Sequence, residues 1–369
     1  MNVGKAVALF CCETTFLDDS LLMVYMNKQS NPTRAVMDIS SIGYAILATI
    51  LALALLLLVV YIRGIIYRRK AAMANLDHVR MEGKTVIITG ASAGIGKETA
   101  RDLARKGARL ILGCRNIPKA TKVAEDIRNT TGNEDVHVKQ LDTSSLASVR
   151  KFANEILVEE ERIDVLILNA GIAGLDHRNL TADGLEYTMA TNHFGHFLLT
   201  NILLGLIKKS RPSRIVVVAS SALTSTLRVD NLNFEKGGFR SFKSYAQSKS
   251  CNVLFTRRLA DLTKGEDVFV NSLNPGFVST EIFDKSGGLM VGKFVRLFVL
   301  FTGRTEVQGA QTVIYVAASE EGGSTTGKFF KECKSSSKAD ALLNNEELAK
   351  QVWEASERLV DLQPNEKHY

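Results

Sequence analysis

The chain has 369 residues, of which 46% are hydrophobic and 23% charged, with 27 glycines and only five prolines. These values exclude a disordered, collagen-like or disulfide-scaffold protein, and they leave ample chain for a buried core. The five cysteines show neither a disulfide framework nor metal-ligand spacing, and the net charge of +7 is too evenly spread for a nucleic-acid-binding surface, so we expect no metal site and no nucleic-acid partner.

Residues 39–62 form an uncharged and strongly apolar segment that includes AILATILALALLLLVVYI. Because a helix rises about 1.5 Å per residue, roughly 20 such residues cross the hydrocarbon core of a bilayer. A buried core helix is the first alternative, but it would normally show a polar face. A cleavable signal peptide is the second, but it would be shorter and would start nearer the N-terminus. We therefore predict a transmembrane signal anchor, preceded by an N-terminal segment, 1–38.

Basic residues crowd the beginning of the predicted linker, 63–81, directly after the apolar segment. The positive-inside rule places this flank, and the chain that follows it, in the cytosol. The endoplasmic reticulum is the default membrane for such an anchor, with a lipid droplet or the mitochondrial outer membrane left open. Two glycosylation sequons, at Asn129 and Asn179, provide a check, because a glycan on either would place the domain in the lumen.

From residue 82 onwards, short apolar runs alternate with amphipathic stretches of helical length. Strands buried on both faces that alternate with helices are typical of a parallel sheet with right-handed crossovers. We therefore predict one α/β domain over 82–334, a Rossmann-type doubly wound parallel sheet, followed by a polar and helical C-terminal extension over 335–369. The expected strands are 84–89, 108–114, 136–141, 163–169, 214–220 and 268–273, and the expected helices are 97–106, 119–130, 145–161, 185–208, 245–263 and 346–362.

The first expected strand ends in TGASAGIG, and a helix follows at once. Gly90, Gly94 and Gly96 permit a tight turn and a close approach of the backbone to a pyrophosphate. The helix N-terminus then offers N–H groups and a partial positive charge to the phosphates. A Walker A loop fits worse, because it needs Gly at Ala91 and Ser or Thr at Glu98. The turn therefore predicts a dinucleotide site.

The second expected strand ends in Cys114, Arg115 and Asn116. An NAD site usually places an acidic residue near this point to hold the ribose 2′-hydroxyl, and none stands here. Arg115 can instead pair with a 2′-phosphate, the alternative being an ordinary exposed arginine. We therefore predict NADP(H) in preference to NAD(H).

Tyr245 and Lys249 form a Y-x-x-x-K pattern at the start of an expected helix. Residues four apart share a helix face, and a lysine cation close to a phenol lowers its pKa toward the range of a general acid/base. The pattern alone is common on solvated helix faces. Further along, the apolar stretch 287–301 suits a lipophilic ligand or the bilayer surface, with an ordinary core helix as the alternative.

Taken together and in this order, the motifs resemble the short-chain dehydrogenase/reductase family across roughly 82–330. The T-G-x-x-x-G-I-G turn, the N-A-G sequence after the fourth strand and the P-G-x-V-x-T turn after the sixth are all present. The nearest group by resemblance is that of the membrane-anchored retinol dehydrogenases, on GIGKETA, the CR pair, NVLFTRRLA and TGKFFKECK. One departure is Val218-Ala219, where many relatives have Asn-Val ahead of a Ser-Ser pair.

The resemblance implies a catalytic tetrad. Tyr245 is expected to act as general acid/base, and Ser221, taken as the second of the serine pair, to stabilise charge on the same substrate oxygen. Lys249 is implied to lower the Tyr245 pKa and hold the nicotinamide ribose, and Asn192 to order a proton-relaying water. The residues implied to bind the cofactor are Gly90, Ser92, Gly94, Ile95, Gly96, Arg115, Asn116, Asp142, Asn169, Ala170, Gly171, Tyr245, Lys249, Pro275, Gly276, Val278 and Thr280.

The expected protein is thus a membrane-anchored, NADP(H)-dependent oxidoreductase that interconverts a lipophilic alcohol and its carbonyl. A retinoid, a steroid and a lipid aldehyde all remain open as substrates, and so does a homodimer as the assembly. The alternative is a non-catalytic, membrane-bound NADPH-binding scaffold or sensor. Decayed enzymes usually lose the tyrosine or the lysine, and both are present here.

Overall fold

The structure, a computed structural model, describes residues 39–69, 71–278 and 303–369. Residues 1–38, Thr280 and the apolar stretch 287–301 lie outside this part of the chain. Contacts divide the chain into two bodies, Met1–Val60 and Tyr61–Tyr369. Helix α3 (Ile39–Arg69) supplies the described part of the first body and continues into the second. An 18-residue window within Gly43–Arg68 has a mean hydropathy of 3.0, and this stretch is long and apolar enough to cross a membrane.

One parallel sheet forms the centre of the second body. Its strands are β1 (Thr85–Thr89), β2 (Arg109–Cys114), β3 (Val136–Gln140), β4 (Val165–Leu168), β5 (Ser213–Val218), β6 (Val268–Asn274) and β7 (Phe329–Lys331). They lie in the order β3-β2-β1-β4-β5-β6-β7. The order reverses between β1 and β4, and ligands of doubly wound sheets bind beyond the carboxyl ends of the strands at such a point. The predicted Rossmann-type fold is confirmed.

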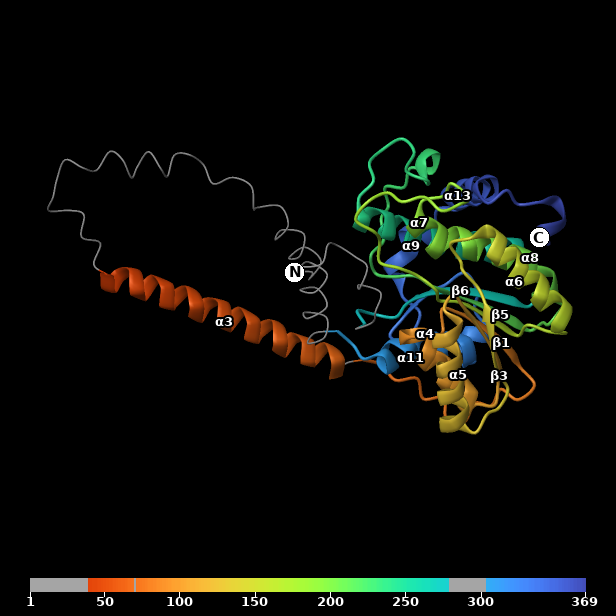
Figure 1. Ribbon diagram of the computed structural model, residues 1–369, viewed down its shortest axis with the longest axis horizontal. Helices are drawn as coiled ribbons and strands as arrows, with labels where there is room; N and C mark the ends of the chain where they lie inside the picture. Colours follow the sequence, from red (N-terminus) through yellow and green to blue (C-terminus); the bar gives the residue numbers. More distant parts are fainter. Residues whose placement is uncertain (1–38, 70, 279–302) are drawn as a thin grey trace. The chain divides into compact units, whose positions relative to one another are not determined.

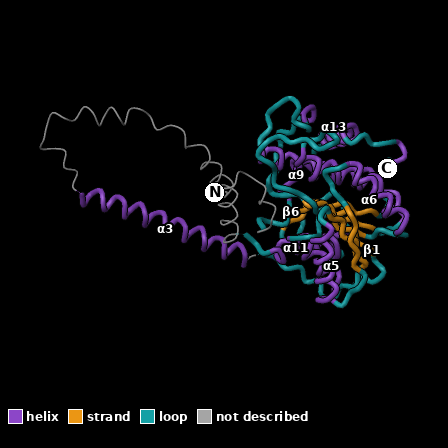
Figure 2. Tube along the Cα trace, in the orientation of Figure 1, coloured by secondary structure: helices purple, strands orange, loops and turns teal. Residues whose placement is uncertain are grey.

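Helices cover both faces of this sheet (Figure 1), and the strands lie between the two helical layers (Figure 2). The helices of the second body are α4 (Gly94–Arg105), α5 (Ile117–Thr131), α6 (Leu146–Glu159), α7 (Tyr187–Met189), α8 (Gly195–Lys209), α9 (Ser241–Leu262), α11 (Glu306–Ala318), α12 (Asp340–Leu343) and α13 (Glu346–Leu359). Alternate strand residues face alternate layers. Val86 and Ile88 of β1 join the core beneath α4, α5 and α11, whereas Ile87 joins the core beneath α6, α8 and α9.

Several parts of the fold differ from the sequence-based expectation, and the strand β7 and the helix α11 were not expected at all. The helix expected over 185–208 is divided by a π-helical turn, Ala190–Phe194, between α7 and α8. Helix α9 begins at Ser241, four residues earlier than expected. The C-terminal region is not a simple appendage, because Trp353 of α13 is 4% exposed and belongs to the same hydrophobic core as the sheet.

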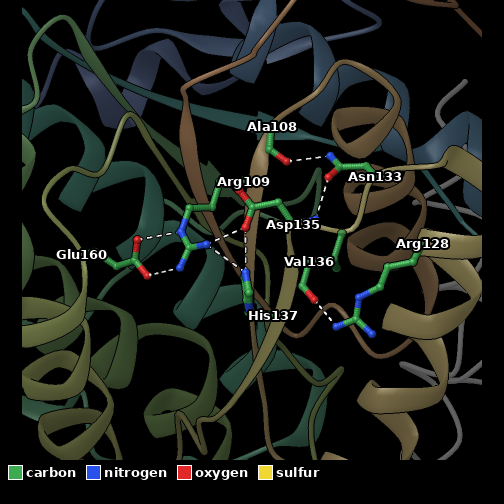
Figure 3. Close-up of polar contacts among 8 residues, drawn as sticks. All are labelled: Ala108, Arg109, Arg128, Asn133, Asp135, Val136, His137 and Glu160. Atoms are coloured by element: carbon green, nitrogen blue, oxygen red, sulfur yellow. Dashed lines mark hydrogen bonds and ion pairs between the residues drawn. The ribbon is translucent and has the colours of Figure 1, made fainter.

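A polar cluster joins β2, β3 and the end of α6 at the amino-terminal edge of the sheet, away from the carboxyl ends of the strands (Figure 3). Arg109 donates to both carboxylate oxygens of Glu160, at 2.9 and 2.8 Å, and to Asp135 at 2.5 Å. His137 Nε2 lies 2.7 Å from the same Asp135 oxygen. The Glu160 side chain is only 5% exposed and pairs with Arg109.

We expect Arg109→Met to destabilise the fold by about 2 kcal/mol, a fall of roughly 5 °C in Tm, because a nearly buried carboxylate loses its bidentate partner. Thermal unfolding of the detergent-solubilised protein measures this. Arg105→Met is the matched control, since it removes the same charge from an exposed position at the end of α4. Equal Tm values for the two variants would show that the cluster contributes nothing.

Candidate active site

The glycine turn between β1 and α4 has the shape that a pyrophosphate needs. Gly90 has φ +70°, and a Cβ there would lie 2.8 Å from Cα of Ala170. A Cβ on Gly96 would lie 2.5 Å from Nδ2 of Asn169 and 2.7 Å from the Gly90 carbonyl oxygen. Ala93 precedes α4 without any side-chain cap, so the first N–H groups of the helix have no internal acceptor. These residues fit the phosphates of a dinucleotide.

Ser92 of the same turn also contacts the end of β2. Hydrogen bonds with Ala91 and Ser92 act on the Cys114 thiol, but burial dominates and raises its pKa to about 11. Gly90 N donates to the Gly113 carbonyl oxygen at 2.8 Å. The turn is thereby held against β2, the strand that Arg115 directly follows.

Thr89 connects the turn to the N-A-G sequence that follows β4. Its Oγ1 accepts from the N–H groups of Asn169 and Ala170, both at 2.9 Å. The Thr89 hydroxyl can therefore donate its own proton to His196 Nε2, which lies 2.9 Å away. The imidazole proton is then on Nδ1, which lies 3.2 Å from the Asn192 carbonyl oxygen. Burial lowers the His196 pKa to about 3, so this ring is neutral and serves packing.

Asn192 lies in the π-helical turn and makes hydrogen bonds with its whole carboxamide. Oδ1 accepts from Ile172 N at 2.8 Å, and Nδ2 donates to the Ile172 carbonyl oxygen and to Ser248 Oγ, both at 2.9 Å. The side chain thus joins the loop after β4 to α9, and π-turns of this kind are frequent at functional sites. Both Nδ2 protons of Asn192 are used, and its main-chain carbonyl oxygen already accepts from Asn252 Nδ2 at 3.0 Å and lies 3.2 Å from His196 Nδ1. A water could therefore bind only the remaining lone pair of Oδ1.

Tyr245 and Lys249 lie on one face of α9, where Lys249 Nζ is 5.9 Å from the centroid of the Tyr245 ring. The ammonium donates to the Val218 carbonyl oxygen at 2.9 Å, and burial lowers the Lys249 pKa to about 8. A Cβ on Gly171 would lie 3.5 Å from Nζ, so the N-A-G loop passes close beside the lysine. Both predicted residues therefore lie at the carboxyl edge of the sheet, beside the glycine turn.

The pKa of Tyr245 does not follow the sequence-based expectation. Burial raises it, and a hydrogen bond with the Ser220 hydroxyl opposes that shift without reversing it. Lys249 is not among the groups that shift the pKa of Tyr245, and burial is the larger of the two causes although the residue as a whole is only partly buried. Tyr245 is consequently protonated at neutral pH in the structure described.

The serine that contacts Tyr245 is Ser220, whereas the sequence pattern pointed to Ser221. Ser221 is exposed, and Ser220 forms the hydrogen bond with the phenol. Successive residues of an extended chain point to opposite sides, so a shift of one position exchanges an inward side chain for an outward one. The sequence contains a signal for Ser220. If the Asn-Val pair of the relatives is aligned with Val217-Val218, by counting from the start of the strand, the serine of the family falls on Ser220.

Arg115 lies at the end of β2 with its side chain 49% exposed. Its Nη1 donates to the Tyr187 hydroxyl at 2.7 Å and lies 4.0 Å from Asp142 Oδ2. Asp142 accepts from the Ser144 N–H and hydroxyl groups, at 2.9 and 2.6 Å. Asn116 caps α5 by accepting from Lys119 N at 3.0 Å. Arg115 and Asp142 thus share one edge, while the Asn116 side chain is occupied by the helix.

The P-G turn follows β6 and brings its residues back toward the glycine turn. Gly276 has φ +92°, and its N–H donates to Asn274 Oδ1 at 3.0 Å. Val278 and Ile95 both lie close to Gly309. A Cβ at residue 309 would be 2.6 Å from Val278 Cγ2 and 3.2 Å from Ile95 Cγ1. Pro275 is buried. The described part of the P-G turn therefore lies close to the start of α4, which follows the glycine turn. Thr280 lies outside the described residues.

The chain is similar to known proteins in sequence. A sequence model of the short chain dehydrogenase family matches residues 84–288. Human retinol dehydrogenase 14 is 42% identical over 297 residues, which cover 76% of this chain and 88% of that protein. Human retinol dehydrogenase 13 is 41% identical over 289 residues, covering 76% of this chain and 86% of its own length.

Solved structures agree with the sequence relatives. A short chain dehydrogenase from Escherichia coli CFT073, complexed with NADPH, superposes with a TM-score of 0.53 at 25% identity, covering 68% of this chain and 97% of its own. An uncharacterised protein from Mycobacterium paratuberculosis gives a TM-score of 0.61 at 28% identity, with 79% and 98% coverage.

Fold and site together define an oxidoreductase of the Rossmann type. The chain belongs to the short-chain dehydrogenase/reductase family, and it is similar to the retinol dehydrogenases of that family.

Proposed function

We propose that this protein is a membrane-anchored, NADP(H)-dependent oxidoreductase that interconverts a lipophilic alcohol and its carbonyl. The observation that carries the proposal is the contact of the Tyr245 phenol with Ser220, on the helix face that also presents Lys249. A proton donor, a second hydroxyl and a cation then lie near one another at the carboxyl edge of the sheet. General acid/base chemistry on an oxygen atom needs such a group.

Each residue has a separate role in the proposed reaction. Tyr245 donates its phenolic proton to the carbonyl oxygen during reduction, and accepts one from the alcohol during oxidation. Ser220 donates a hydrogen bond to the same oxygen and stabilises the charge that develops there. Lys249 stabilises the phenolate by its charge and hydrogen-bonds the ribose, while Asn192 holds α9 and the N-A-G loop in register. A bound nicotinamide would supply or accept the hydride.

Arg115 supports NADPH as the preferred cofactor. Its guanidinium is half exposed beyond the end of β2, at the edge where the adenosine ribose would lie, and Tyr187 and Asp142 restrict its direction. A planar guanidinium pairs bidentately with a phosphate, and no acidic side chain follows β2 directly to bind a ribose hydroxyl. The relative from Escherichia coli was solved with NADPH.

A lipophilic substrate and a membrane location are supported together. The relatives at 42% and 41% identity are retinol dehydrogenases, and retinol is a lipophilic alcohol. Helix α3 has the length and apolarity to anchor the chain in the membrane from which such a substrate partitions. We place the domain on the cytosolic face of the endoplasmic reticulum, a placement that glycosylation of Asn129 or Asn179 would contradict.

The test is a panel of retinoid, steroid and lipid aldehydes, assayed with NADPH and NADH on membranes that contain the full chain. We expect turnover with NADPH in preference to NADH. Arg115→Gln should weaken NADPH about tenfold and leave NADH nearly unchanged, because a charge-assisted contact to the 2′-phosphate is lost.

Arg105→Gln is the matched control, since this arginine is exposed at the far end of α4. A wild-type preference for NADH would overturn the role of Arg115. NADPH binding without turnover of any member of the panel would favour the non-catalytic scaffold or sensor.

A further inference from the structure

The last turn of α3 lies against the P-G turn of the proposed cofactor site, and both belong to the body Tyr61–Tyr369. The Tyr67 hydroxyl accepts from the Phe277 N–H at 2.9 Å. Arg68 Nε donates to the Gly303 carbonyl oxygen, and Gln308 Nε2 donates to the Arg68 carbonyl oxygen at 3.1 Å. The end of α3 therefore forms hydrogen bonds with Phe277, shortly after β6, and with Gly303 and Gln308 further along the chain.

Arg304 holds the Tyr67 ring in this position. Its guanidinium lies 4.4 Å from the ring centroid, a cation–π contact, and its Nη2 lies 2.7 Å from Glu332 Oε1. The Arg304 side chain is 3% exposed, and its main-chain N–H donates to the Phe277 carbonyl oxygen at 2.7 Å. Both main-chain polar groups of Phe277 thus have partners in this cluster, one from Tyr67 and one from Arg304.

The cluster also explains why residue 276 is glycine. A Cβ at Gly276 would lie 2.7 Å from the Tyr67 hydroxyl and 3.0 Å from Arg304 Nη1. On the other side, Val278 and Ile95, the second residue of α4, both lie close to Gly309. The segment 275–278 is therefore enclosed between the end of α3 and the turn that would hold the pyrophosphate.

We propose that Tyr67 is a positioning residue for the cofactor: it holds the segment 275–278 in the shape that the nicotinamide half requires. The inference rests on the proposed function, because it needs a nucleotide in the site. It gives α3 a second role, since its last turn belongs to the binding machinery. A preformed turn binds more tightly because less ordering is needed when the ligand arrives.

Two substitutions separate the hydroxyl from the ring. Tyr67→Phe removes the acceptor of the Phe277 N–H and keeps the surface on which Arg304 stacks, whereas Tyr67→Leu removes both. Tyr44→Phe is the matched control, because it deletes a phenolic hydroxyl from the same helix at a residue that is 72% exposed. All variants are made in the full chain and reconstituted in nanodiscs.

Two readouts are needed. NADPH affinity, measured by the fluorescence of the bound cofactor, should fall roughly two- to tenfold in Tyr67→Phe and further in Tyr67→Leu, with Tyr44→Phe equal to wild type. Hydrogen–deuterium exchange of the peptide that contains Phe277, measured without nucleotide, should accelerate in the same order. The strands of the sheet should keep their wild-type protection.

The outcomes distinguish the two levels of the proposal. If Tyr67→Phe matches Tyr44→Phe in both affinity and exchange, Tyr67 does not position the turn. Faster exchange with unchanged NADPH affinity also overturns the inference, because the contact would then be structural only. If wild type binds neither NADPH nor NADH, the proposed function itself fails and the inference falls with it.

Discussion

Replacing Tyr245 with phenylalanine is expected to lower turnover about a thousandfold while NADPH affinity falls less than about tenfold. The substitution removes the phenolic oxygen alone, so the substrate oxygen loses its proton donor while the ring keeps its place on α9. Burial raises the Tyr245 pKa, which means that the proton is present on the phenol at neutral pH. Single-turnover rates of carbonyl reduction, with NADPH binding measured in parallel, check this result.

Tyr315→Phe is the control for this experiment. Tyr315 lies on α11, and its hydroxyl donates to Glu321 Oε2 at 2.6 Å. The variant therefore loses a phenolic hydrogen bond outside the proposed active site. We expect it to keep wild-type turnover. A Tyr245→Phe enzyme that retained more than about a tenth of the wild-type rate would eliminate the acid/base role.

The second large effect is expected at Ser220. Ser220→Ala should reduce turnover about a hundredfold or more, the usual loss when a donor to a developing oxyanion is deleted. Ser221→Ala should stay close to wild type, because the Ser221 side chain is exposed and it is the Ser220 hydroxyl that bonds Tyr245. Ser221→Ala is thus the matched control for Ser220→Ala, because both variants lose one hydroxyl and the two residues are adjacent.

The reverse ranking would restore the assignment that the sequence pattern suggested. A large loss in Ser221→Ala with a normal Ser220→Ala would show that the loop after β5 rearranges when cofactor and substrate bind. Equal and small losses in both would leave Tyr245 without a serine partner in catalysis.

The order of strands and helices could be predicted from local sequence because burial leaves a periodic record. Strand β1 is apolar throughout, since it is covered on both faces, and a glycine turn follows it. Strand β7 has no such apolar pattern that could be recognised in the sequence. It is only three residues long, and its identity depends on the pairing of Ser272 with Phe329 and of Leu273 with Phe330.

The interruption of the helix over 185–208 also escaped the sequence pattern. The residues around Asn192 have helical character, but its side chain bonds the loop after β4 and Ser248 of α9. Those partners are far away in the chain, so the pattern of the helix itself cannot reveal the π-turn. The early start of α9 has a similar cause, because Ser244 Oγ donates to Glu186 Oε2 at 2.6 Å.

Sequence alone determined the apolar helix, the glycine turn, the Y-x-x-x-K pair and their order, and therefore the family. These features are local: each needs only a few neighbouring residues to have physical meaning. Tertiary structure decided that Ser220 faces Tyr245, that Arg115 meets Tyr187, and that Tyr67 bonds the turn at Phe277. Such contacts join residues far apart in the chain or depend on the side to which a strand end points, and packing of the whole domain sets both.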